Sequence, residues 1–291
     1  MNQEAALGAF CVAGAGVLWG MLGLFVRALG ESGLLPLDVV GVRAIVTALA
    51  LLIFLLVRSP GRLAVRLRDV WCFVGTGICS IVFFNLCYFT AVRMMSLASA
   101  AVLLYTAPAF VMVLSRLLFG ERLTRRRLAA LLAAFLGCVS VTGVFGAQPE
   151  LTALGVAIGL GAGLGYALYT IFSRYALARG YDAVTITFYT FLFAAVCVLL
   201  IGGATRIAAA AADPAACALM VTLGLVSTVA PFLLYTYGLT RLSGARASII
   251  ASIEPVTAAL LGVVCYGERL SAQTLLGLLL VLLGIFIARK A

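Results

Sequence analysis

FGERLT, at residues 119–124, recurs as YGERLS at residues 266–271. The offset between the copies is 266 − 119 = 147, and the same offset relates other pairs of residues along the chain. These pairs are Gly14 with Gly161, Gly16 with Gly163, Trp19 with Tyr166, Arg27 with Arg174, Pro108 with Pro255 and Gly137 with Gly284. A fixed offset over a whole chain is typical of a duplicated structural unit. We therefore expect two related halves, residues 1–147 and 148–291.

The composition indicates a membrane protein. Hydrophobic residues make up 65% of the chain and charged residues 10%, with a mean hydropathy of +1.21, whereas a soluble domain carries about 25% charged residues. Apolar stretches of about 20 residues recur, and each is long enough to cross a hydrocarbon core. They must be helices, because backbone groups in lipid need partners within their own segment.

We predict an all-α polytopic fold with ten transmembrane helices. The expected spans are residues 5–27, 36–57, 70–92, 96–118, 125–144, 152–173, 184–203, 215–238, 244–266 and 272–288. Five spans in each half is an odd number, so the second half enters the membrane from the side opposite to the first. The two halves are thus expected to be inverted repeats.

The distribution of basic residues predicts the orientation. With both termini in the cytoplasm, only Arg27, Arg93, Arg206 and Arg269 fall outside, Arg43 lies within a span, and the other 15 of the 20 Lys and Arg fall inside. This bias follows the positive-inside rule for an inner-membrane protein. The excess of positive charge is thereby explained without nucleic acid as a partner. The two GERL copies agree with this topology, since FGERLT is followed by three arginines and YGERLS by Ala-Gln-Thr.

The repeated motif resembles the EamA domain of the drug/metabolite transporter superfamily. The resemblance rests on the pattern PxxxxxxxxxxxGERL, which begins at Pro108 and at Pro255, together with Trp19, Arg43 and Glu254. It covers both halves and implies ten spans and export or exchange of small metabolites, often amino acids, without ATP. Inverted repeats favour alternating access with a substrate site near the midplane. The halves differ where Ala107 occupies the position of Glu254, and no clear arginine matches Arg43.

Glu254 and Arg43 are the leading candidates for the charged part of a substrate site. An ionisable side chain inside a span is costly and is a functional-site hypothesis by default. Glu254 would bind a substrate ammonium or couple transport to protons. Its alternatives are a structural ion pair and a protonated carboxyl bonded to a neighbouring helix. Arg43 would bind a substrate carboxylate, pair with Glu254 or Asp38, or extend toward the interface. Asp38 could equally be a helix-start residue. Pro255 and its repeat partner Pro108 are candidate hinges, because proline removes a helical hydrogen bond.

Polar and aromatic side chains inside the spans are candidates to line the same site. They are Trp19, Asn85, Tyr88, Tyr105, Tyr166, Tyr169, Tyr189 and Tyr235. Aromatic faces suit organic cations and solutes with rings. The alternative for each is core filling or a place in the interfacial aromatic belt.

Other chemistry finds no support in the sequence. The eight cysteines have no CxxC spacing, histidine is absent, and no phosphate-binding loop, metal cluster or hydrolytic triad is present. We therefore predict no cofactor, no metal and no enzymatic activity. The expected partners are a small-molecule substrate, membrane lipid and a proton as a coupling ion; nothing indicates an oligomeric state. The predicted function is export or exchange of an amino acid or related zwitterion. Alternatives are an exporter of organic cations or aromatic drugs, and a membrane-embedded enzyme or lipid-handling factor.

Overall fold

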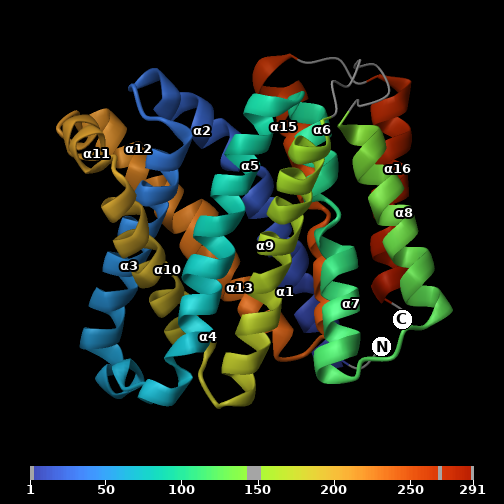
Figure 1. The fold of residues 1–291 in the computed structure, drawn as a ribbon, viewed down its shortest axis with the longest axis horizontal. Helices are drawn as coiled ribbons and strands as arrows, with labels where there is room; N and C mark the ends of the chain where they lie inside the picture. The colour runs from blue at the N-terminus through green and yellow to red at the C-terminus, as the bar shows by residue number, and fades with distance from the viewer. Residues whose placement is uncertain (1–2, 143–151, 268–270, 290–291) are drawn as a thin grey trace.

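The computed structural model describes residues 3–142, 152–267 and 271–289, and these form helices and short connections (Figure 1). The first half contains α1 Gln3–Gly20, α2 Leu22–Glu31, α3 Pro36–Arg58, η1 Pro60–Leu63, η2 Leu67–Asp69, α4 Val70–Val74, η3 Gly75–Val82, α5 Phe83–Met94, α6 Leu97–Leu104, α7 Ala107–Phe119 and α8 Arg125–Val141. The second half contains α9 Ala153–Ala178, α10 Ala183–Ile201, α11 Ala204–Ala211, α12 Pro214–Gly224, η5 Leu225–Val229, α13 Ala230–Leu239, α14 Gly244–Ala251, α15 Glu254–Tyr266 and α16 Ala272–Arg289. The expected boundary between residues 147 and 148 lies outside the described residues, as do Glu268 and Arg269 of the second GERL copy.

The predicted membrane helices are confirmed, and they are arranged as two inverted repeats. In the described part of the chain, nine helical segments are long and apolar enough to cross a membrane. The tenth, α8, has 17 residues there and packs along α16, which is the corresponding helix of the other repeat. In Figure 1 both termini lie at one end of the bundle, here called the terminal end. The C-terminus of α7 lies at this end, whereas that of α15 lies at the opposite end.

Two of the spans that the sequence predicts as continuous are broken at their middle. Residues 96–118 form α6 and α7, which are separated by Tyr105 and Thr106, and residues 244–266 form α14 and α15. Both breaks precede a proline: Pro108 has no amide hydrogen for Leu104, and Pro255 has none for Ala251. The first span is likewise broken, at Met21. Spans three and eight contain π-helical turns, η3 and η5, at matching repeat positions.

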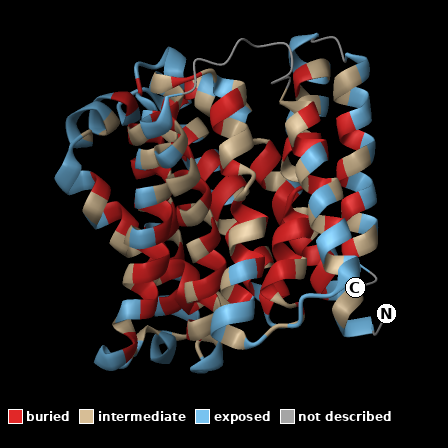
Figure 2. Cartoon of the chain, turned by 45° about the vertical axis from the view of Figure 1, so that its right-hand side comes forward, coloured by how far each residue is buried: buried red, intermediate tan, exposed pale blue. Residues whose placement is uncertain are grey.

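Glycines allow each broken helix to approach the first helix of the other half. A Cβ on Gly16 of α1 would lie 2.8 Å from Ala251 O, and one on Gly163 of α9 would lie 2.8 Å from Leu103 O. Gly137 of α8 and Gly284 of α16 similarly face the backbone of the opposite helix. These contacts interlock the two halves around the middle of the bundle, where buried residues concentrate (Figure 2). The exposed apolar side chains, such as Leu200 and Val264, suit contact with lipid.

Candidate functional site

A pocket near the middle of the bundle is lined by residues from both halves. Its lining comprises Trp19, Leu22, Arg43, Ser80, Ile81, Phe84, Asn85, Tyr166, Tyr169, Thr170, Phe232, Tyr235 and Glu254. It continues into a vestibule of about 620 Å³, which shares Trp19, Arg43 and Glu254 and is also lined by Arg27 and Thr142 toward the end opposite the terminal end. This volume lies within the range of small-molecule sites.

Arg43 is held in place by a side chain of the other half. It lies on α3 with 8% of its surface exposed, and its Nε donates to Thr228 Oγ1 over 3.0 Å. Thr228 is fully buried in the π-helical turn η5, which turns its hydroxyl toward α3. Nε is bound to Thr228, so the edge of the guanidinium formed by Nη1 and Nη2 can still donate two parallel hydrogen bonds to another acceptor.

Glu254 is placed in the pocket by the break before α15. It is the first residue of α15, where the positive end of the helix dipole stabilises a carboxylate. Tyr166 on α9 donates its hydroxyl to Glu254 Oε2 over 3.1 Å. Arg43 and Glu254 line one pocket, yet among the ion pairs of the described residues none joins these two side chains. The two opposite charges attract each other across the pocket but make no direct ion pair.

Aromatic rings form one wall of the pocket around Trp19. The Trp19 ring centroid lies 5.2 Å from that of Phe232, 5.3 Å from that of Tyr235 and 6.4 Å from that of Tyr166. The edge-to-face geometry of the Phe232 and Tyr166 contacts is a favourable arrangement of ring quadrupoles. Trp19 and Tyr166, which correspond in the repeat, thus contact each other in this wall.

Tyr169 and Tyr235 direct their hydroxyls into protein. Tyr169 bonds Thr236 over 2.6 Å, and Tyr235 bonds Thr170 over 2.7 Å. Both rings line the pocket while their polar ends are bound to other hydroxyls. Tyr166, Tyr169 and Thr170 follow one face of α9, with Ser173 continuing that face toward the terminal end.

The other candidates from the sequence lie in the pocket, in the vestibule or outside both. Asn85 lines the pocket and donates to Ile81 O over 2.7 Å within its own helix. Tyr88 and Tyr105 line the vestibule. Tyr189 does not join them: its hydroxyl donates to Leu63 O over 2.6 Å, and its ring packs on Phe73. Tyr189, which the sequence predicts to line the site with the other tyrosines, is thus not among the residues that line the pocket or the vestibule.

Several lining residues were not predicted, and Asp38 was assigned two possible roles. Phe84, Phe232 and Thr170 line the pocket, but in such an apolar sequence nothing distinguishes them from core residues. Asp38 accepts from Leu35 N at the start of α3 and from Arg206 at 2.6 and 2.9 Å, so it is a helix-start residue and does not pair with Arg43. The hydrogen bonds to Asp38 raise the pKa of the Arg206 guanidinium.

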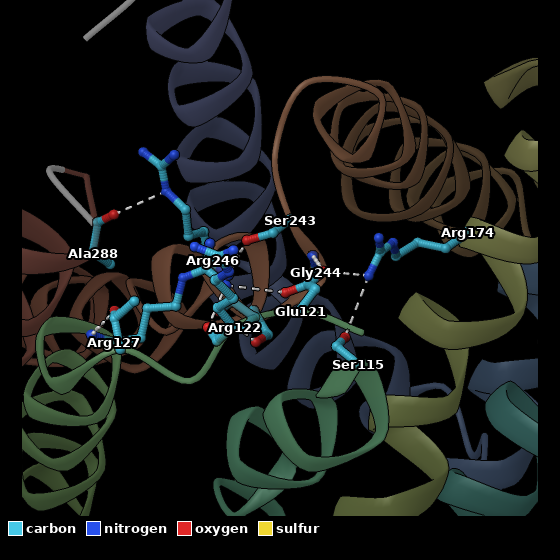
Figure 3. A network of polar contacts seen from close by, with 12 residues as sticks. Ser115, Glu121, Arg122, Arg127, Arg174, Ser243, Gly244, Arg246 and Ala288 are labelled. Carbon is cyan, nitrogen blue, oxygen red and sulfur yellow. Dashed lines mark hydrogen bonds and ion pairs between the residues drawn. The ribbon is translucent and has the colours of Figure 1, made fainter. Parts of the chain in front are cut away.

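A network of polar contacts joins several helices at the terminal end of the bundle, and Figure 3 shows it from close by. Glu121 forms an ion pair with Arg174 of α9 and accepts from Arg127 of α8 at 3.4 Å and from the backbone N–H of Gly244 at 3.1 Å. Arg174 also donates to Ser115 over 3.4 Å. Gly120, at φ 67°, makes the turn of the GERL motif. The Glu121 carboxylate next to it joins three helices.

One contact beside this network recurs at the matching positions of the repeat. Arg174 lies over the ring of Phe119, with Cζ 4.1 Å from the centroid, and Arg27 lies over Tyr266 at the same distance. Arg174 and Phe119 lie at the terminal end, whereas Arg27 lines the vestibule. The helices that follow the two motifs are capped, since Thr124 Oγ1 accepts from Arg127 N and Ser271 Oγ accepts from Thr274 N.

Comparison with known proteins identifies similar chains. The model of the EamA-like transporter family matches residues 6–143 and 153–289. An uncharacterized transporter of Archaeoglobus fulgidus is 32% identical over 275 residues, which cover 94% of this chain and 92% of that protein. The uncharacterized transporter YwfM of Bacillus subtilis is 27% identical over 278 residues, covering 95% and 92%. A crystal structure at 20% identity has a TM-score of 0.79 and covers 99% of this chain and 97% of its own, which shows a shared fold.

Proposed function

The chain belongs to the EamA-like transporter family, whose members are transporters and not enzymes, and we propose that it exports or exchanges a small zwitterion by alternating access. An amino acid or a related metabolite is the proposed substrate. The observation that carries this proposal is that Arg43 and Glu254 line one pocket without pairing with each other.

Electrostatics favours a ligand with both charges. A lone charge inside the membrane is expensive, and an occupant that supplies the opposite charge offsets that cost. The free donor edge of Arg43 matches a carboxylate with two parallel hydrogen bonds. Glu254, which keeps one oxygen beyond its bond to Tyr166, matches an ammonium group. A zwitterion satisfies both residues at once, and the rings around Trp19 then face its side chain.

A second candidate is an organic cation with an aromatic ring. The observation that favours it is the wall formed by Trp19, Phe232, Tyr235 and Tyr166, since aromatic faces attract cations. Such a substrate would use Glu254 and the rings but would make no use of Arg43. The two candidates therefore differ in what they require of Arg43.

Alternating access is supported by the contrast between the two ends of the site. The vestibule leads from the pocket toward one end, while the Glu121 network joins α7–α8, α9 and α14 at the other. The proposed orientation, with both termini in the cytoplasm, makes this conformation open to the exterior. Exchange of the two repeat conformations would close the vestibule and open the terminal end. In this cycle Pro108 and Pro255 are the proposed hinges, and Glu254 is the proposed site of proton coupling.

The test is transport in proteoliposomes, with a panel of radiolabelled amino acids and aromatic amines. We expect uptake of at least one amino acid, and its loss in Glu254→Gln and in Arg43→Gln. Glu31→Gln and Arg116→Gln are matched controls, because both side chains are exposed and lie outside the pocket. Transport of an aromatic amine that is unaffected by Arg43→Gln would replace the zwitterion by the second candidate. Transport that survives both substitutions in the pocket would refute the proposed site.

A further inference from the structure

We infer that the connector between α3 and α4, together with the end of α9, forms a binding site for the phosphate group of an anionic phospholipid. The connector spans residues 59–69 and lies at the terminal end of the bundle, away from the central pocket (Figure 1). The inference does not depend on what the central pocket carries.

The connector is held rigidly by residues of the second half. Asp69, with 4% of its surface exposed, accepts from Arg179 Nε at 3.1 Å and from the Tyr181 hydroxyl at 2.9 Å. The Tyr181 oxygen in turn accepts from Arg66 N over 3.1 Å. These bonds fix the backbone at Arg66, so the arginines that follow it project from a defined surface.

A second set of contacts fixes the earlier part of the connector. Tyr189 donates to Leu63 O, Thr185 donates to Arg62 O over 3.2 Å, and Arg62 pairs with Asp182 at 3.3 Å. This accounts for Tyr189, which the pocket does not use. The connector is thus held along its length by contacts with the second half.

Positive charge on this surface exceeds negative charge. A cavity of about 520 Å³ is lined by Arg66, Arg68, Arg179, Asp69 and Ala178. Its one carboxylate, Asp69, is bound to Arg179. Among the ion pairs of residues 3–142, 152–267 and 271–289, none involves Arg66 or Arg68, and both are exposed. Planar guanidinium groups bind phosphate oxygens with paired hydrogen bonds, which favours an anion with several acceptor oxygens.

Apolar side chains next to the arginines indicate that the phosphate belongs to a lipid. Leu67, between Arg66 and Arg68, is 89% exposed, and Trp71 is 41% exposed beneath Arg179, whose Cζ lies 4.9 Å from the indole centroid. Tryptophan is enriched at the level of lipid head groups. Basic clusters at the cytoplasmic ends of spans are typical of sites for anionic head groups. Leu67 and Trp71 would contact the acyl chains, which a soluble phosphate lacks.

The experiment is thermal unfolding of the purified full-length protein in a neutral detergent. We expect phosphatidylglycerol to raise the midpoint by at least about 2 °C relative to phosphatidylcholine. The double variant Arg66→Gln/Arg68→Gln should lose this difference, while Arg116→Gln, an exposed arginine outside the site, should keep it. An equal rise with both lipids, or a rise that persists in the double variant, would overturn the inference.

Two further arms identify the source of the phosphate. Inorganic phosphate at millimolar concentration should give less than half of the lipid effect, and Leu67→Ser should weaken only the lipid effect. If inorganic phosphate reproduces the full shift and Leu67→Ser changes nothing, the site takes soluble phosphate and the assignment to lipid is wrong. A variant that fails to fold is recognised by its midpoint without lipid. Native mass spectrometry of the retained lipid then decides, because a bound anionic lipid should be lost from the double variant.

Discussion

Arg43 Nε donates to Thr228 Oγ1 over 3.0 Å, and this bond joins the two halves of the chain beside the central pocket. Thr228 has no surface exposed, so an Arg43 that lost this acceptor would keep an unpaired donor in a buried place. Thr228 is therefore a positioning residue for Arg43.

Thr228→Val is predicted to impair recognition of the substrate carboxylate. The loss of one hydrogen bond from a charged donor costs about 1.5–3 kcal/mol, which corresponds to a KM raised by roughly 10- to 100-fold. Thr228→Ser keeps the hydroxyl and should retain transport. Counterflow in proteoliposomes measures KM for an amino acid and for the matching amine without a carboxylate. Only the first should change, and an equal effect on both would assign Thr228 a merely structural role.

Tyr166→Phe is predicted to weaken binding through Glu254. The substitution removes the hydroxyl that donates to Glu254 Oε2 over 3.1 Å but keeps the ring that faces Trp19. A bond to a carboxylate is worth about 1.5–3 kcal/mol, so substrate affinity should fall at least about tenfold. Tyr189→Phe is the matched control, because its hydroxyl bonds Leu63 O away from the pocket. Isothermal titration of substrate makes the measurement; equal losses in both variants would contradict the predicted role of Tyr166.

Glu121→Gln is predicted to shift the protein toward a state open at the terminal end. Glu121 is 10% exposed and pairs with Arg174 and Arg127, and the loss of about 1.4 kcal/mol would change the ratio of the two states about tenfold. Ser173 is fully buried between the pocket and Arg174, so a cysteine placed there reports opening. In a background without other cysteines, maleimide labelling of Ser173→Cys should accelerate when Glu121→Gln is added. Arg116→Gln should leave the labelling rate unchanged, and an unchanged rate in Glu121→Gln would show that the network is no gate.

The sequence predicts those features that depend on a short stretch of the chain. The spans follow from apolar length, and Arg43 and Glu254 stand out because charges inside spans are rare. The repeat at offset 147 predicts which positions correspond, such as Trp19 and Tyr166, but not that these two rings meet. The packing of the helices determines whether two rings meet, and it also determines which way a tyrosine side chain points from its helix. Tyr189 therefore lies outside the group of tyrosines in which the sequence places it, and the sequence does not distinguish Phe232 from core residues.

The breaks and π-helical turns show a second limit. Pro108 and Pro255 predict weakened helices, yet the break lies before each proline. Leu104 and Ala251, whose carbonyls receive no bond from these prolines, are the last residues of the preceding helices. The π-helical turns, which turn Ser80 and Thr228 into their contacts, arise from an i→i+5 hydrogen-bond pattern. An extra residue in one turn leaves no mark on hydropathy, so the sequence does not reveal it.

Gly16→Ala and Gly163→Ala are predicted to destabilise the fold by similar amounts. An added Cβ would lie 2.8 Å from Ala251 O in the first case and 2.8 Å from Leu103 O in the second, and neither backbone can move away without shifting a broken helix. Overpacking of this kind costs about 1–3 kcal/mol, which should lower the unfolding midpoint by several degrees. Gly30→Ala is the matched control, because nothing lies within 4 Å of its added Cβ. There alanine should leave the midpoint unchanged or raise it slightly, since it restricts the unfolded chain. Equal unfolding midpoints for all three variants would contradict the prediction. The close approach of α1 and α9 to the broken helices would then contribute nothing to holding the two halves together.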